Sequence, residues 1–146
     1  MKIRHLFSAT AFLLLVSFLS NNTFAQSNSQ GWQLLKSENG IEIFSQRVSC
    51  NIEGAPNSFD YITFKVLNNS TSIQNLGLQF QVHFEEGCNG CQGKDETYTE
   101  VKLNPGQSIE GSCSEMENKL AYFILNPTFA DSWKYTHSEV LIQPIK

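Results

Sequence analysis

The fold class is decided by residues 76–85, which read Leu76-Gly77-Leu78-Gln79-Phe80-Gln81-Val82-His83-Phe84-Glu85. Apolar residues alternate with other residues along the whole stretch, so that five apolar side chains share one face. Period two is the spacing of a β-strand, because successive side chains point to opposite faces. The stretch therefore predicts a strand with one face in a core and the other toward solvent.

Further short strands are predicted on both sides of this stretch. Asn39-Gly40 separates two apolar runs and predicts a tight hairpin, because both turn positions require a positive φ. Phe59 to Leu67 alternates in the same way as residues 76–85. Seven or eight strands in about 120 residues, without helical periodicity, predict a single all-β domain. We expect a two-sheet antiparallel sandwich of immunoglobulin-like type, with a small barrel as the alternative.

The first 25 residues have the three parts of a secretory signal peptide. Lys2 and Arg4 form a basic start, an apolar run follows, and the segment ends in the small residue Ala25. The apolar run is shorter than the roughly 20 residues of a membrane-spanning helix, so no membrane insertion is expected after cleavage. The sequence predicts a signal peptide over residues 1–25, a domain over residues 26–146, and a secreted or periplasmic location.

The charge of the chain limits its partners. The sequence has 10 basic and 14 acidic residues, and loss of Lys2 and Arg4 with the leader gives a net charge of about −6. Nucleic acids and anionic membranes both require a basic surface, and residues 26–146 contain no basic cluster. Nucleic acid is therefore not an expected partner.

Four cysteines, Cys50, Cys88, Cys91 and Cys113, are the most informative residues after the strand pattern. If consecutive strands run up and down, Cys50 and Cys113 end two strands at one pole of the sandwich. Cys88 and Cys91 lie in a loop that the same count assigns to that pole. We therefore expect all four sulfur atoms at the end of the fold opposite the Asn39-Gly40 turn.

Three chemistries could use this set of cysteines. In an exported protein with an even number of cysteines we favour two structural disulfides, Cys50–Cys113 and Cys88–Cys91. The alternative is a zinc site that all four thiolates complete, because the Cys88-x-x-Cys91 spacing suits zinc. A redox-active Cys-x-x-Cys motif is disfavoured, since that motif works at the start of a helix and this one lies in a glycine-rich loop.

The other candidate residues are histidines and aromatic residues. His83 lies on the polar face of the clearest strand, where a solvated surface is the expected role, and His137 is predicted at the opposite pole, away from His83. Phe129, Trp133 and Tyr135 form a candidate aromatic binding surface near that opposite pole. No catalytic motif and no cofactor-binding motif is found in the sequence.

Several motifs together resemble small exported bacterial proteins of immunoglobulin-like fold and unassigned function. They are Trp32, the Asn39-Gly40-Ile41 hairpin, Cys50, Phe64-Lys65-Val66-Leu67-Asn68, Cys88-x-x-Cys91, Leu103-x-Pro105-Gly106 and Gly111-x-Cys113. The resemblance implies the fold but no activity. We therefore expect a non-catalytic, disulfide-stabilised binding or surface-associated module with a protein or glycan ligand and no cofactor. The alternatives are a metal-dependent protein with a cysteine-rich zinc site, or a carrier of an apolar ligand.

Overall fold

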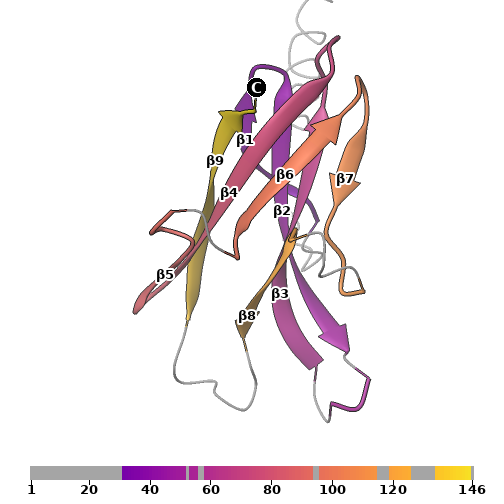
Figure 1. Ribbon diagram of the computed structural model, residues 1–146. Coiled ribbons are helices and arrows are strands. Elements are labelled where there is room, and N and C mark those ends of the chain that lie inside the picture. The colour runs from indigo at the N-terminus through magenta and orange to yellow at the C-terminus, as the bar shows by residue number, and fades with distance from the viewer. Residues whose placement is uncertain are drawn as a thin grey trace, which may run out of the picture.

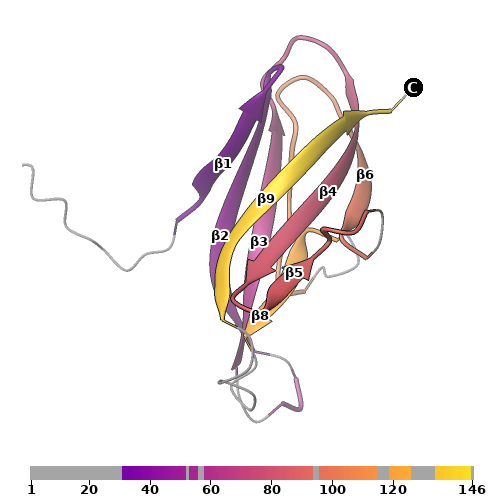
Figure 2. The same ribbon diagram turned by 90° about the vertical axis from the view of Figure 1, so that its left-hand side faces the viewer.

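The structure is a computed structural model that describes residues 31–51, 53–55, 58–93, 96–114, 119–125 and 134–145. Nine strands in these residues form two antiparallel sheets packed face to face (Figures 1 and 2). Sheet A consists of β1 (Gln33–Glu38), β2 (Ile41–Asn51), β3 (Ser58–Asn68), β7 (Ser108–Glu110) and β8 (Ala121–Leu125). Sheet B consists of β4 (Gln74–Phe84), β5 (Gly87–Asn89), β6 (Tyr98–Leu103) and β9 (Tyr135–Pro144).

The predicted fold class, a single all-β domain of two antiparallel sheets, is confirmed. The strand that the sequence did not predict is β5, which lies in the expected glycine-rich loop. The strands β1, β2 and β3 are neighbours in sheet A. In the immunoglobulin order the second and third strands belong to different sheets, so the finer immunoglobulin-like description is not confirmed.

The core lies between the sheets and is built largely from the alternation that the sequence shows. In β4, Leu76, Leu78, Phe80 and Val82 are each no more than 5% exposed. The ring of Phe80 stacks on that of Phe64 from sheet A, with ring centroids 4.2 Å apart. Contacts of this kind between the sheets bury apolar surface, which stabilises the fold. Apolar side chains from the two sheets are thus in contact at the place where an apolar-ligand carrier would need a cavity.

The direction of β7 and β8 differs from the expected up-and-down order. Both strands pair antiparallel with β3, so they run in the same direction along one edge of it. The end of β7 and the start of β8 both meet β3 at Phe64. Gly111 N–H donates to Phe64 O, and Phe64 N–H donates to Leu120 O. β8 therefore continues along β3 in the direction of β7. As a result the start of β9 lies at the pole of Cys50, opposite to the sequence expectation.

Gly90 and Thr97, from the segment between β5 and β6, pack against β4. Gln79 Nε2 donates to Gly90 O at 3.2 Å and to Thr97 Oγ1 at 2.5 Å, and Phe80 N–H donates to Thr97 O at 3.1 Å. Gly90 is buried at φ +86°, and a Cβ there would lie 2.1 Å from Phe80 O. Only glycine fits so close to the strand, and this contact fixes the turn that follows β5 and carries Cys91.

An ion pair joins the ends of β2 and β3 near the Cys50 pole. Arg47 donates to Asp60 Oδ2 from Nε at 3.1 Å and from Nη2 at 2.6 Å, and Ser49 Oγ donates to Asp60 Oδ1. Burial alone would raise the pKa of Asp60, but these hydrogen bonds and the positive charge of Arg47 outweigh it and lower the pKa.

Replacing Asp60 with asparagine should therefore reduce the fall in the free energy of unfolding as the pH is lowered. A carboxyl with a lowered folded-state pKa stabilises the fold above its unfolded-state pKa, and this contribution is lost as the pH falls through the folded-state value. The measurement is the free energy of urea unfolding between about pH 6 and about pH 3. An equally steep acid loss in the variant and the wild type would show that Asp60 does not contribute to it.

The described residues contain no helix with the length and apolar character that a membrane span requires. The predicted signal peptide, residues 1–25, lies outside the described residues.

Candidate functional site

A cluster of polar side chains lies on the outer face of sheet B, at the Cys50 pole. It is centred on His83 of β4, which faces outward because its two neighbours along the strand, Val82 and Phe84, face the core. His83 is paired with His137 of β9 on one side and with Cys88 of β5 on the other. The three strands thus bring three potential ligand residues into one row across the sheet.

The imidazole rings of His83 and His137 stack on each other. Their centroids are 4.2 Å apart and their planes differ by 8°. The sequence prediction that His137 lies at the opposite pole is therefore wrong, and the reason is that β7 and β8 run in the same direction along β3. The chain contains three histidines, and the third, His5, falls in the predicted leader. Every histidine of residues 26–146 therefore belongs to this cluster.

Glu139 adds a carboxylate to the pair. It lies two residues beyond His137 on the same face of β9, and its carboxylate oxygens lie 3.6 Å from His137 Nε2 and 4.0 Å from His83 Nε2. His137 Nδ1 lies 3.1 Å from Thr136 Oγ1. The side chains of His137 and Glu139 are more than half exposed, whereas that of His83 is only 23% exposed. The cluster is therefore anchored at His83 and open to solvent on its β9 side.

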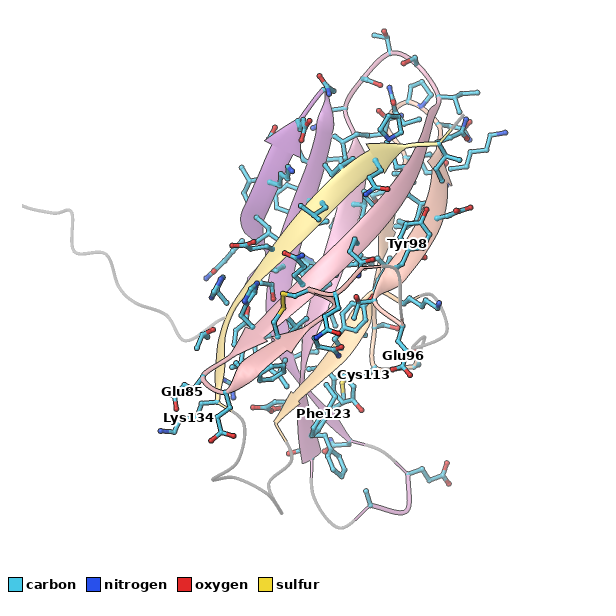
Figure 3. The ribbon with its side chains drawn as sticks, turned by 60° about the vertical axis from the view of Figure 1, so that its left-hand side comes forward. Glu85, Glu96, Tyr98, Cys113, Phe123 and Lys134 are labelled. Atoms are coloured by element: carbon cyan, nitrogen blue, oxygen red, sulfur yellow. A yellow bond between two sulfur atoms is a disulfide. The ribbon has the colours of Figure 1, made fainter. Side chains whose placement is uncertain are left out.

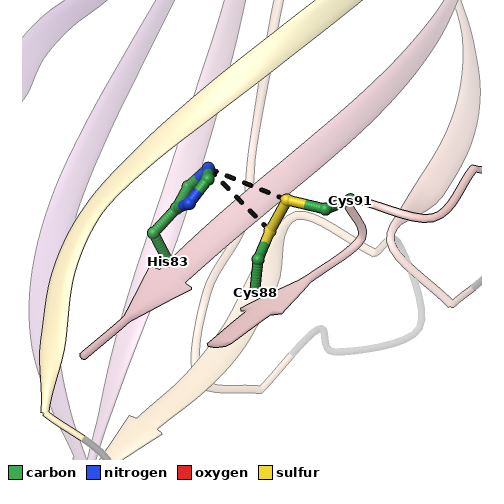
Figure 4. Close-up of side chains that lie close together, drawn as sticks. All are labelled: His83, Cys88 and Cys91. Carbon is green, nitrogen blue, oxygen red and sulfur yellow. Dashed lines mark hydrogen bonds between the residues drawn. A yellow bond between two sulfur atoms is a disulfide. The ribbon is translucent and has the colours of Figure 1, made fainter. Parts of the chain in front are cut away.

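The Cys88–Cys91 disulfide lies on the other side of His83 (Figure 4). His83 Nε2 is 3.8 Å from the Sγ atom of Cys88 and 3.8 Å from that of Cys91. The same histidine nitrogen thus faces a carboxylate and imidazole on β9 and two sulfur atoms on β5 and its loop. This shared position is the central geometric feature of the site.

The ligand atoms of His83, His137 and Glu139 lie within 4.8 Å of one another. Two imidazole nitrogens bound to one zinc ion in tetrahedral geometry are about 3.4 Å apart, so a small closure would bring them into range. A metal lies in the plane of each imidazole it binds, and hence one ring must turn from the stacked arrangement. His137 has the solvent space to turn, since its side chain is 55% exposed.

The other two cysteines do not join this cluster. Cys50 and Cys113 form a second disulfide, so that both bridges have the pairing favoured from the sequence. Cys50 pairs with Phe59 on the outer face of sheet A and is fully buried beside Tyr61 and Ala121. The two bridges therefore lie on opposite faces of the sandwich. The geometry does not bring the four sulfur atoms together as a tetrahedral zinc site would require.

The predicted aromatic surface is only partly described. Phe129 and Trp133 lie outside the described residues. Tyr135 is half-buried against the core at the Cys50 pole, and its hydroxyl lies 3.0 Å from Ser138 Oγ. A different aromatic group lies on the outer face of sheet A, where the ring of Phe123 contacts those of Phe59 and Tyr61. Phe123 is labelled in Figure 3. The expected protein or glycan ligand stays a prediction.

Sequence reasoning placed His83 on an outer face but missed His137 and Glu139 as its neighbours. The available signal was the alternation His137-x-Glu139, which puts both side chains on one face of the last strand. That signal identifies the face but not the neighbouring strand. Which residue of β4 lies beside His137 depends on the direction of β9, and strand counting predicted the opposite direction.

Comparison with known proteins assigns no family to the chain. No family model and no curated protein matches the sequence. One solved structure is similar, the crystal structure of a DUF1425 family member from Shewanella sp. pv-4. It is 12% identical with a TM-score of 0.40, and the match covers 81% of this chain and 93% of that chain. A similarity this low supports no conclusion about function.

Proposed function

We propose that this protein is an exported, non-catalytic binding module that holds a divalent transition-metal ion on the outer face of sheet B. The observation that carries the proposal is the meeting of His83 and His137 from strands far apart in the sequence, with Glu139 beside them. Two histidines and a carboxylate within ligand distance are a donor set typical of bound metal ions.

The donor atoms favour one class of ion. Imidazole nitrogen suits zinc, copper and nickel, whereas calcium and magnesium prefer sites built from oxygen atoms. Among first-row divalent ions, Cu²⁺ and its neighbours bind nitrogen ligands most tightly. Three protein ligands leave coordination positions for water on the exposed β9 side. A Zn²⁺ or Cu²⁺ ion is therefore the proposed ligand.

Export is supported by two features of the chain. The first 25 residues have the pattern of a cleavable signal peptide. The two disulfides are typical of proteins that mature in an oxidising compartment. Both features fit a secreted or periplasmic protein. The non-catalytic role is proposed because the sequence contains no recognisable catalytic motif.

The proposal is tested by calorimetric titration of Zn²⁺ and Cu²⁺ into the oxidised protein purified from the exporting compartment. We expect one site per chain, and His83→Ala or His137→Ala should each weaken binding by at least about tenfold, because each removes a ligand. Glu139→Gln should weaken it less. Glu110→Gln is the matched control, since Glu110 is 56% exposed against 57% for Glu139 but lies on sheet A. Wild-type affinity in both histidine variants would contradict the proposal.

A further inference from the structure

We propose that the Cys88–Cys91 disulfide is a redox switch beside the metal site. A thiol reductant would open the bridge and create a second site, made by His83 with the Cys88 and Cys91 thiolates, for a soft ion such as Cu⁺ or for Zn²⁺. This inference rests on the proposed function in one respect, because the reduced site would take His83 from the oxidised one.

The geometry around His83 already approaches that of a metal site with two sulfur ligands. At the usual Zn–N and Zn–S bond lengths, a tetrahedral site places nitrogen and sulfur about 3.6 Å apart. His83 Nε2 lies 3.8 Å from both Sγ atoms, so the histidine needs almost no movement. The two sulfur atoms must separate to about 3.8 Å, and the Cα atoms, 5.8 Å apart, allow this by side-chain rotation.

The short bridge is also the one that a reductant opens more readily. Each bridge has one exposed cysteine, Cys91 in the short bridge and Cys113 in the long one. The second cysteine is half-buried in the short bridge, Cys88, and fully buried in the long one, Cys50. The Cys50–Cys113 bridge spans 63 residues against 3 for Cys88–Cys91, so its loss removes a larger constraint from the unfolded chain. A disulfide that stabilises the fold more is harder to reduce. We therefore expect mild reduction to open Cys88–Cys91 and to leave Cys50–Cys113 intact.

Opening of the bridge is a thiol–disulfide exchange that involves only the two cysteines and a dithiol reductant. A thiolate of a dithiol reductant attacks the Cys91 Sγ atom, the S–S bond breaks, and Cys88 leaves as a thiolate. The second thiol of the reductant then resolves the mixed disulfide. Two electrons and two protons pass to the cysteines, and the reductant becomes a disulfide. Binding of the metal ion to the thiolates releases their protons.

The two sites exclude each other because they share one nitrogen. In the oxidised protein His83 Nε2 faces Glu139 at 4.0 Å, with His137 stacked beside it. In the reduced protein the same nitrogen completes the site with two sulfur ligands. Thiolates prefer softer ions than imidazole and carboxylate do. Reduction would thus change which ion the protein holds.

The experiment uses Co²⁺ as the probe, added anaerobically to oxidised protein and to protein reduced with dithiothreitol and desalted. Mass mapping should find two free thiols, at Cys88 and Cys91. Reduced protein should give thiolate-to-cobalt charge-transfer absorption that saturates at one equivalent, and oxidised protein should give none. The double variant Cys88→Ala, Cys91→Ala should lose this absorption, while His137→Ala should keep it. His83→Ala should weaken cobalt binding in the reduced protein by at least about tenfold.

The outcomes separate this inference from the proposed function. Charge-transfer absorption in reduced protein supports the sulfur site even if the oxidised protein binds no metal, a result that would end only the proposed function. Absence of the absorption, or its persistence in the Cys88→Ala, Cys91→Ala variant, overturns the inference. Four free thiols after mild reduction also overturn it, because the bridge would then have no selective response.

Discussion

Replacing Cys50 and Cys113 with alanine should lower the free energy of unfolding by about 4 kcal/mol, whereas replacing Cys88 and Cys91 should lower it by only about 2 kcal/mol. The two bridges span 63 and 3 residues, and a longer closed loop removes more entropy from the unfolded chain. Urea unfolding of the two double variants and the wild type measures both values.

The environment of Cys50 makes the larger loss specific to that bridge. Cys50 is fully buried with Tyr61 and Ala121, so its loss also leaves a gap in the packing on the outer face of sheet A. Alanine is chosen over serine because a buried hydroxyl would add a separate cost. Equal losses in the two double variants would contradict the assignment of the main stabilising role to the long bridge.

Replacing Gly90 with alanine should lower the free energy of unfolding by at least about 3 kcal/mol. The new Cβ would lie 2.1 Å from Phe80 O and 2.2 Å from Thr97 Oγ1, at a residue with φ +86°. The backbone of β4 or the loop must therefore move, and the hydrogen bond from Gln79 to Gly90 O is strained. Thermal or urea unfolding gives the loss.

The matched control for this prediction is Gly106→Ala. Gly106 has a similar φ of +74°, but a Cβ there would meet nothing within 4 Å. Its substitution should lower the free energy of unfolding by only about 1–2 kcal/mol, because alanine is disfavoured in the left-handed backbone conformation. If both variants lose the same stability, the close contact between Gly90 and β4 does not hold the loop in place.

Local features of the sequence predicted local structure well. The alternation of residues 76–85 gave a strand whose apolar side chains are buried, and Asn39-Gly40 forms its turn with φ values of 51° and 78°. Both features depend on side-chain period or backbone conformation within a few residues. The disulfides also followed from short-range and compartment arguments.

The direction of the last strands could not be predicted in the same way. Strand counting assumes that a polar segment between two apolar runs reverses the chain, yet β7 and β8 run in the same direction along β3. Gly111 and Leu120 meet at Phe64, where a Cβ on Gly111 would lie 2.1 Å from Leu120 O. A glycine in the sequence is compatible with many turns. That Gly111 allows the close approach of Leu120 is visible only from the contact in the folded structure. The position of His137 beside His83 depends on that contact.

Nuclear magnetic resonance of the two imidazole rings during Zn²⁺ addition tests the central claim most directly. In the oxidised, exported protein His83 and His137 are the only histidines expected, so each nitrogen signal can be assigned with one variant. We predict that one nitrogen of each ring shifts in parallel and that both shifts are complete at one equivalent of Zn²⁺. Rings that do not respond, or a response of one ring alone, would contradict a metal site shared by His83 and His137.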